Sequence, residues 1–226
     1  MTSRPAVTIA VAGAATDVGK TWVAVGLSEQ LRSMGRRVSA RKPVQSYTVG
    51  TVTTDAHLLG AATGEEPASV CPSHRWYPLA MAPPIAAHRL GLAPIALHDL
   101  LDELTWPGDV EFGLVETVGG VRSPMADDAD SATFLRSLRP EHVVLVADAA
   151  LGAINAVRLC AAALAPLDVT VVLNRFDPGD VVHVTNREWL VGRDGLTVVT
   201  TVTQCVAAVL RRCSIGPSDP DGRLAG

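Results

Sequence analysis

The sequence contains few aromatic residues, few cysteines and no long apolar run. Only 4 % of its 226 residues are aromatic although 48 % are apolar, so we expect a core made mainly of Ala, Val and Leu. The 4 cysteines show no close paired spacing, which argues against a zinc site and against a disulfide scaffold. No apolar stretch is long enough to span a membrane, and the N-terminus lacks a signal-peptide pattern. We therefore expect a reduced cytoplasmic location and no membrane partner.

Excess positive charge is also missing. The formal net charge of −4 argues against a nucleic-acid partner held by phosphate contacts. The length favours one domain, which we assign to residues 1–213, with enough chain for a substantial core. Residues 214–226 are rich in Gly, Pro, Asp and Ser and are expected to form a loose tail.

Short apolar runs alternate with segments of helical periodicity along the whole chain. The expected strands are residues 7–12, 37–41, 112–116, 142–147, 169–173 and 197–202. The expected helices are residues 21–34, 55–62, 97–104, 131–138, 155–164 and 204–212. This alternation predicts a three-layer α/β fold with a mostly parallel sheet and helices on both faces. Ligands in such folds bind beyond the carboxyl ends of the strands.

The strongest motif is Gly13-Ala14-Ala15-Thr16-Asp17-Val18-Gly19-Lys20-Thr21, between the first strand and the first helix. A loop whose amides point inward and lead into a helix N-terminus forms an anion site. In a phosphate-binding loop Lys20 would reach the β- and γ-phosphates and the Thr21 hydroxyl would bind Mg²⁺. The leading glycine is one residue earlier than the usual spacing. The motif therefore makes nucleotide use the leading hypothesis.

Three further charged residues follow strand ends. Lys42 comes after the second strand, where Pro43 disfavours helix, and could neutralise a transferring phosphoryl group. Asp55 begins the next helix, either as a cap or as a Mg²⁺ ligand. Glu116 ends a buried strand before Thr117-Val118-Gly119-Gly120 and could sense a metal and a γ-phosphate. Each has an ordinary structural interpretation, but three such residues after different strands predict one site.

On these motifs the chain resembles the dethiobiotin synthetase family of the P-loop group that contains MinD-like and cobyrinate-amidating proteins. The family's loop also starts one residue early, which accounts for Gly13. Its Lys-Pro-Val-x-Ser motif corresponds to residues 42–46, and its Glu-Gly-Ala-Gly-Gly motif to residues 116–120. Residues 81–87 resemble its Pro-bearing substrate loop, and residues 151–155 its Leu-Gly-x-Ile-Asn turn.

The resemblance implies an enzyme that uses ATP and Mg²⁺ to close a cyclic urea. In the family, 7,8-diaminononanoate captures CO₂ as a carbamate, the γ-phosphate transfers to the carbamate, and the second amine closes the ring. It also implies a homodimer, because the counterpart of Asn155 reaches the substrate carboxylate from the partner subunit.

The site residues implied by the resemblance fall into four groups. The catalytic lysines are Lys20 and Lys42, and the Mg²⁺ ligands are Thr21, Asp55 and Glu116. The substrate residues are Thr16 and Ser46 for the carbamate, with Gly152, Ala153 and Asn155 at the partner's site. The nucleotide residues are Asp17, Val18, Gly19, Lys20, Thr21, Trp22, Asp55, Glu116, Thr117, Val118, Gly119, Asn174 and Thr203. Asn174 would read adenine, whereas Trp22 has packing against the first helix as its more ordinary interpretation.

Several positions depart from the family's pattern. Thr117 and Val118 replace Gly-Ala, Tyr47 replaces a glycine, Ala156 replaces a common histidine, and Thr203 replaces a proline. These changes keep two alternatives open. One is a MinD- or ParA-like switch ATPase, although Ala15 stands where those proteins carry an additional lysine. The other is a non-catalytic homologue that binds nucleotide.

Overall fold

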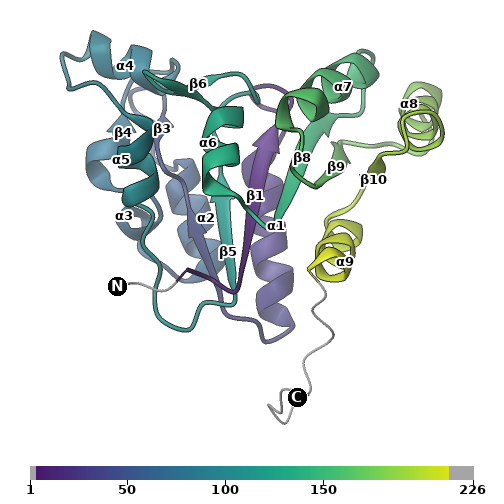
Figure 1. The fold of residues 1–226 in the computed structure, drawn as a ribbon, viewed down its shortest axis with the longest axis horizontal. Helices are drawn as coiled ribbons and strands as arrows, with labels where there is room; N and C mark the ends of the chain where they lie inside the picture. The colour runs from purple at the N-terminus through teal and green to yellow at the C-terminus, as the bar shows by residue number, and fades with distance from the viewer. Residues whose placement is uncertain (1–3, 214–226) are drawn as a thin grey trace.

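The centre of the molecule is a parallel sheet of six strands in the order β10-β9-β8-β1-β5-β2 (Figure 1). This computed structural model describes residues 4–213, so the tail predicted at 214–226 lies outside the described residues. The strands are β1 (Val7–Gly13), β2 (Val38–Arg41), β5 (Phe112–Glu116), β8 (His142–Asp148), β9 (Val169–Asn174) and β10 (Thr197–Val199). The parallel sheet predicted from the sequence is confirmed.

Alternate residues of the buried strands face two separate hydrophobic cores. In β1, Ile9 and Val11 face one core, whereas Ala10 and Ala12 face the other. This arrangement explains why the strands are apolar at consecutive positions, because both faces of the sheet are covered.

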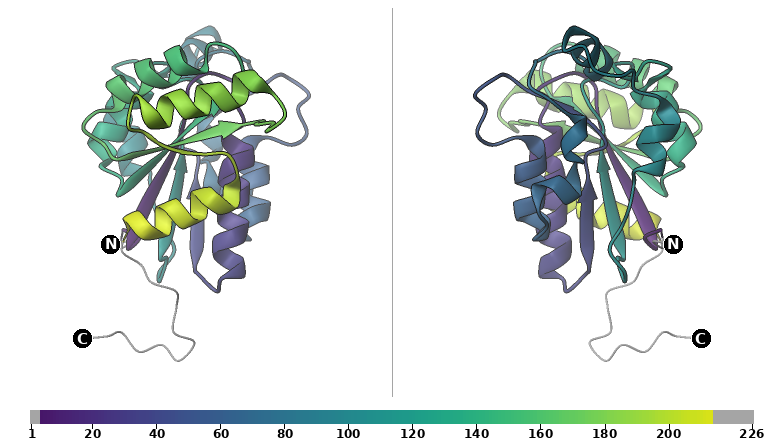
Figure 2. Two further views of the ribbon diagram at one scale, coloured as in Figure 1. Left: turned by 90° about the vertical axis from the view of Figure 1, so that its right-hand side faces the viewer. Right: turned by 90° about the vertical axis from the view of Figure 1, so that its left-hand side faces the viewer.

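Helices cover both faces of the sheet (Figures 1 and 2). The first core contains side chains of α1 (Lys20–Ser33), α2 (Asp55–Thr63), α3 (Pro67–Val70) and α9 (Val202–Arg212). The second contains side chains of α4 (Pro83–Arg89), α5 (Leu97–Asp102), α6 (Ser131–Leu138), α7 (Ala153–Leu164) and α8 (Val181–Gly192). Among residues 4–213, no helix has both the length and the apolar character needed to cross a membrane.

Short elements complete the fold at the carboxyl end of the sheet. Strands β3 (Gln45–Ser46) and β4 (Trp76–Tyr77) pair in parallel, and β6 (Pro124–Ala126) pairs with β7 (Ala129–Asp130) in antiparallel fashion. A single turn of 3₁₀ helix, η1 (Ser73–Arg75), leads into β4.

Two local predictions were wrong. Helix α8 was missed because only Asn186 and Leu190 of its residues are buried, which leaves little apolar periodicity. The strand expected at 197–202 ends at Val199, since the Thr201 side chain accepts a hydrogen bond from Gln204 N and caps α9. Residues 81–87, which resemble a substrate loop, run into the helix α4 (Pro83–Arg89), which begins with two prolines as helix N-termini allow.

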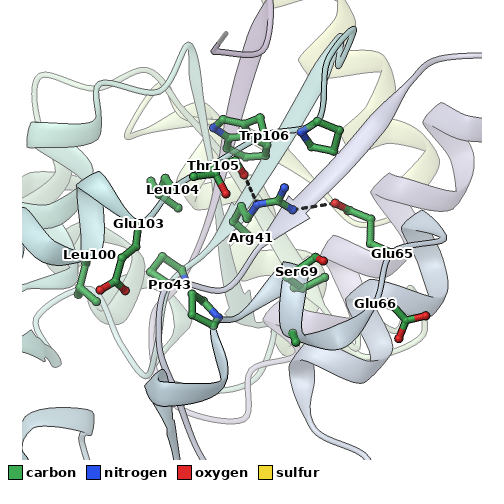
Figure 3. A pocket seen from close by; sticks show the side chains of 14 residues that line it. Arg41, Pro43, Glu65, Glu66, Ser69, Leu100, Glu103, Leu104, Thr105 and Trp106 are labelled. Carbon is green, nitrogen blue, oxygen red and sulfur yellow. Dashed lines mark hydrogen bonds and ion pairs between the residues drawn. The ribbon is translucent and has the colours of Figure 1, made fainter. Parts of the chain in front are cut away.

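The outer edge of the sheet is closed by side chains (Figure 3). Two residues of the edge strand β2 donate hydrogen bonds to Glu65, which follows α2: Ala40 N at 2.9 Å and the Arg41 side chain at 2.8 Å. Arg41 also donates to Ala40 O. The Arg41 guanidinium donates to Thr105 O (2.5 Å) and lies 4.9 Å from the ring centroid of Trp106. These contacts satisfy backbone groups that would otherwise invite pairing with another strand. A cavity of about 370 Å³ lies beside them.

Candidate active site

The phosphate-loop motif connects β1 to α1 as predicted. The Lys20 side chain folds back over Gly13, and its Nζ donates to Ala15 O at 3.2 Å. A Cβ on Gly13 would lie 2.8 Å from Lys20 Cδ and 2.9 Å from Ala15 O, so no larger residue fits there. The early glycine therefore makes room for the lysine side chain that follows.

Gly19 is required for a different reason. Its φ of +94° suits glycine, and a Cβ would lie 2.1 Å from Asn174 Nδ2. Asn174, at the end of β9, donates to Val18 O at 2.9 Å. The loop is thus held from the far side by a residue about 150 positions away in sequence.

Thr21, Lys42, Asp55 and Glu116 form one hydrogen-bonded cluster beyond the ends of β1, β2 and β5. Lys42 Nζ lies 2.6 Å from Glu116 Oε1 and 2.8 Å from Asp55 Oδ2. Thr21 Oγ1 lies 2.9 Å from Glu116 Oε1 and 3.0 Å from Asp55 Oδ1. Thr54, rather than Asp55, occupies the cap position of α2, which leaves the Asp55 carboxylate available to this cluster. The register of three neighbouring parallel strands brings these residues together.

Burial sets the electrostatics of the cluster. The side chains of Lys42 and Glu116 are only 2 % and 1 % exposed. Burial alone would lower the pKa of Lys42, but the charges of Glu116 and Asp55 outweigh it and raise that pKa. The charge of Lys42 lowers the pKa of Asp55, whereas burial raises the pKa of Glu116. Lys42 is therefore held as a cation between the carboxyl groups.

Lys20 has the opposite electrostatic setting. Burial and then the neighbouring Lys42 charge lower its pKa. Lys20 and Lys42 line the same cavity, and they are the only lysines among the 19 Lys and Arg residues of the sequence. That concentration of lysine in one place was a sequence signal that motif reasoning did not use.

This difference predicts selective chemical modification. Reductive methylation with formaldehyde should label Lys20 at a lower pH than Lys42, because only the neutral amine reacts and a lowered pKa supplies more of it. Peptide mass spectrometry after labelling between pH 7 and pH 9 measures both sites. The N-terminal amine serves as an internal control, and equal labelling rates for the two lysines would contradict the prediction.

One buried oxygen of the cluster lacks a partner. Within the described residues, Glu116 Oε2 is buried and accepts no hydrogen bond. Such an atom is costly unless a ligand satisfies it. Two carboxylates and a hydroxyl are a suitable set for Mg²⁺, which takes one or two carboxylates and completes its shell with water and phosphate oxygens. The residues present therefore fit this ion.

The cluster opens into a cavity of about 730 Å³ at the carboxyl end of the sheet. The predicted site residues that line it are Thr16, Asp17, Gly19, Lys20, Thr21, Lys42, Ser46, Asp55, Glu116, Val118 and Gly119. Ser46 Oγ donates to Met81 O at 2.5 Å, and Tyr47 also lines the cavity. The structure thus brings most of the predicted site into a single space.

The structure accounts for the Thr117-Val118 pair, which replaces the family's Gly-Ala. Thr117 is fully buried, and its backbone N donates to Val11 O at 3.0 Å. Its hydroxyl lies 3.4 Å from the same carbonyl oxygen, so the side chain faces β1. Val118 packs into the hydrophobic core and only borders the cavity. The departure from Gly-Ala is accommodated within the protein.

Five residues assigned to the nucleotide lie outside the lining of this cavity: Val18, Trp22, Thr117, Asn174 and Thr203. Asn174 reaches the loop through Val18 O, as described above. Thr203 is exposed in the first turn of α9, where it accepts from Gln30 Nε2 at 3.3 Å. Trp22 is 60 % exposed and belongs to neither hydrophobic core.

The residues Gly152, Ala153 and Asn155 are also outside the cavity. Gly152 has a φ of +96° and precedes α7, and Asn155 is exposed on the first turn of that helix. Leu151 beside them is 91 % exposed.

Ser123 and Arg175 are among the cavity residues that sequence reasoning missed, together with Thr48 and Ala80. Ser123 accepts from Gly120 N at 2.8 Å and closes the turn after β5. Arg175 directly follows Asn174, so its position after a strand end was a usable signal. Neither residue belongs to a motif.

Comparisons with known proteins place the chain in a family. Residues 7–205 match the protein-family model described as an AAA domain. The chain is 38 % identical over 162 residues to the ATP-dependent dethiobiotin synthetase BioD of Methylobacterium nodulans, covering 66 % of this chain and 70 % of the relative. It is 33 % identical over 182 residues to that of Aquifex aeolicus, covering 78 % and 80 %.

Solved structures support the fold. A plasmid partition protein from Borrelia burgdorferi has a TM-score of 0.55 at 14 % identity, with 94 % of this chain and 98 % of that chain covered. The signal recognition particle receptor FtsY from Elizabethkingia anophelis has a TM-score of 0.53 at 15 % identity, with 91 % and 66 % covered. At such identities the likeness concerns the fold alone, whereas the sequence relatives establish descent. The chain belongs to the dethiobiotin synthetase family.

Proposed function

We propose that this chain is an ATP-dependent dethiobiotin synthetase that joins CO₂ to 7,8-diaminononanoate in biotin biosynthesis. The observation that carries the proposal is the convergence of Lys20, Lys42, Thr21, Asp55 and Glu116 on one cavity beyond the phosphate loop. The family relatives support the same activity.

The proposed reaction has three steps. One amine of the substrate adds to CO₂ and loses a proton, which forms a carbamate. A carbamate oxygen attacks the γ-phosphorus of ATP, the bond to the β-phosphate oxygen breaks, and ADP leaves. The second amine attacks the carbonyl carbon of the mixed anhydride, and the cyclic urea forms with release of phosphate and a proton.

The principal catalytic problem is repulsion among anions, and the two lysines address it. From its position over the loop, the Lys20 ammonium group would bind the β- and γ-phosphates. Lys42 is fixed by Glu116 and Asp55 in the same cavity, where its charge would stabilise the migrating phosphoryl group and the carbamate. Because both ammonium groups are buried, their charges are weakly screened by water.

Thr21, Asp55 and Glu116 would hold Mg²⁺. When bound, this ion neutralises charge on the β- and γ-phosphates. The unpartnered Glu116 Oε2 supports this assignment, and Lys42 and Thr21 orient the other oxygen of the same carboxylate.

Glu116→Gln should raise the Mg²⁺ concentration needed for half-maximal activity. Glutamine keeps an oxygen for Thr21 and Lys42 but removes the anionic charge that attracts the metal. Phosphate release measured across a Mg²⁺ titration tests this, with Glu188→Gln on α8 as a matched control. A titration identical to that of the unmodified protein would mean that Glu116 does not bind the metal.

The remaining predicted residues would bind the carbamate and the base. Thr16 and Ser46 would hydrogen-bond the carbamate, and Asn174 would read the base with the part of its amide that Val18 O leaves free. The Ser46 hydroxyl would have to turn from Met81 O to do so. A cytoplasmic location remains a prediction from sequence.

We also propose a homodimer in which Gly152, Ala153 and Asn155 complete the partner's site. The support is the exposure of Gly152 and Asn155 at the start of α7, next to the exposed Leu151 and Leu159, whereas the Ala153 side chain is buried. Sedimentation velocity measures this state directly, and a monomer at micromolar concentration would contradict it.

The function is tested by phosphate release with ATP, Mg²⁺, bicarbonate and 7,8-diaminononanoate, each omitted in turn. We expect release to require all four components and the product to have the mass of the cyclic urea. Release that continues without the diamine or without bicarbonate would contradict the proposed synthetase.

A further inference from the structure

The phosphate loop contains a residue other than glycine in a left-handed backbone conformation. Between Gly13 and Gly19 the loop has only Ala, Thr, Asp and Val, and Asp17 adopts a φ of +58°. A left-handed conformation is costly for a residue other than glycine, so contacts from elsewhere in the fold must hold it.

Those contacts come from the end of β9. Asn174 Nδ2 donates to Val18 O at 2.9 Å, and Arg175 Nη2 donates to Asp17 O at 2.7 Å. Two consecutive residues of one strand end therefore grip two consecutive carbonyl groups of the loop. Arg175 also has a left-handed backbone conformation, with a φ of +56°, where the chain leaves β9.

A third element fixes the arginine. Arg175 Nη1 lies 2.7 Å from Asp148 Oδ2 at the end of β8. Asp148 Oδ1 in turn accepts from Ala150 N at 3.0 Å. That backbone hydrogen bond, with Arg175, lowers the pKa of Asp148, so the carboxylate is ionised when it pairs with the guanidinium.

We infer that Arg175, braced by Asp148, is a positioning residue that holds the phosphate loop in its triphosphate-binding shape. This inference rests on the proposed use of ATP. The role is indirect: the guanidinium acts through the Asp17 carbonyl, and its side chain lines the same cavity as Lys20.

The test compares binding of ATP and of inorganic tripolyphosphate, both with Mg²⁺, by isothermal titration calorimetry. Arg175→Ala should weaken both ligands equally, by about tenfold, as expected for loss of one hydrogen bond from a charged group. Arg175→Lys should recover part of the loss. In turnover, the KM for ATP should rise while kcat changes little.

Asp148→Ala distinguishes positioning from direct contact. If Arg175 acts through the loop, removing its brace should weaken both ligands as well. If Arg175 instead touches the phosphates, removing the nearby negative charge should leave binding unchanged or strengthen it, which would overturn the inference. A loss confined to ATP would also overturn it, because tripolyphosphate carries no base or ribose.

Arg4→Ala is the matched control. Arg4 makes the same kind of contact at the other end of the sheet, donating to the carbonyl of the left-handed Arg139 at 2.6 Å and to Glu141. It should leave both affinities unchanged, and melting temperatures of all variants should stay close to that of the unmodified protein. If the unmodified protein binds neither ligand, the proposed function fails; if it binds both and Arg175→Ala binds them equally well, only the positioning role fails.

Discussion

Lys42→Met is expected to lower phosphate release by about 100-fold or more, the loss that follows removal of a group stabilising charge in a transition state. Lys42 is one of two lysines in the chain, and its ammonium group is held 2.6 Å from Glu116 and 2.8 Å from Asp55. Methionine keeps the length of the side chain but removes the charge. A steady-state assay of phosphate release in saturating ATP, Mg²⁺, bicarbonate and diamine measures the effect.

The same change should also affect stability. Removing one partner of a buried ion pair typically costs about 3–5 kcal/mol, because the remaining charge is left without compensation. The charge left without compensation would be that of the Glu116 carboxylate, because Glu116 is as fully buried as Lys42. Urea unfolding of Lys42→Met should therefore show a lower midpoint.

The double variant Lys42→Met/Glu116→Gln separates the two effects. It removes both charges, so unfolding stability should recover in part while phosphate release stays low. If Lys42→Met instead retains the rate of the unmodified protein, Lys42 has no part in phosphoryl transfer and the proposed mechanism is wrong.

Glu65→Ala is expected to lower the free energy of unfolding by about 3–5 kcal/mol, although Glu65 lies outside the active-site cavity. Burial would raise the pKa of Glu65, but hydrogen bonds from Ser39, Arg41 and Ala40 N hold it below the usual value. Alanine would remove the acceptor for all three groups and leave the Arg41 guanidinium, which is 6 % exposed, without its carboxylate (Figure 3).

Equilibrium urea denaturation measures this loss. The matched control is Arg41→Met/Glu65→Leu, which replaces the pair by apolar side chains and should be more stable than Glu65→Ala alone. Recovery should be incomplete, because Ala40 N and Ser39 still lose their acceptor. A loss below about 1 kcal/mol in the single variant would mean that water screens the pair as it does at exposed sites.

Much of the fold followed from local patterns. The strands were found because each is apolar on consecutive residues, and their parallel order follows from the alternation with helices. Helix α8 escaped detection because it buries only Asn186 and Leu190, while apolar residues such as Val181, Val182 and Trp189 are exposed and do not form one buried face. Where propensity and capping disagreed, as at Thr201, the cap determined the end of the strand.

The location of the candidate site could also be predicted from local patterns. Lys20, Thr21, Lys42, Asp55 and Glu116 were predicted because each lies at a strand end or in the connection that follows one, and parallel strands bring their carboxyl ends to one edge. Their shared location in one cavity is confirmed, while their roles stay proposals.

The sequence alone determined the phosphate loop, the parallel sheet and the family, because a strand, a turn and a helix that follow one another in the chain are specified by neighbouring residues. Only the tertiary structure decided that Lys42 is clamped between two carboxyl groups, that Thr117 turns toward β1, and that Arg175 reaches back to Asp17. Those contacts join residues from about 13 to more than 150 positions apart, and the direction in which a side chain turns depends on packing and burial that no local pattern encodes.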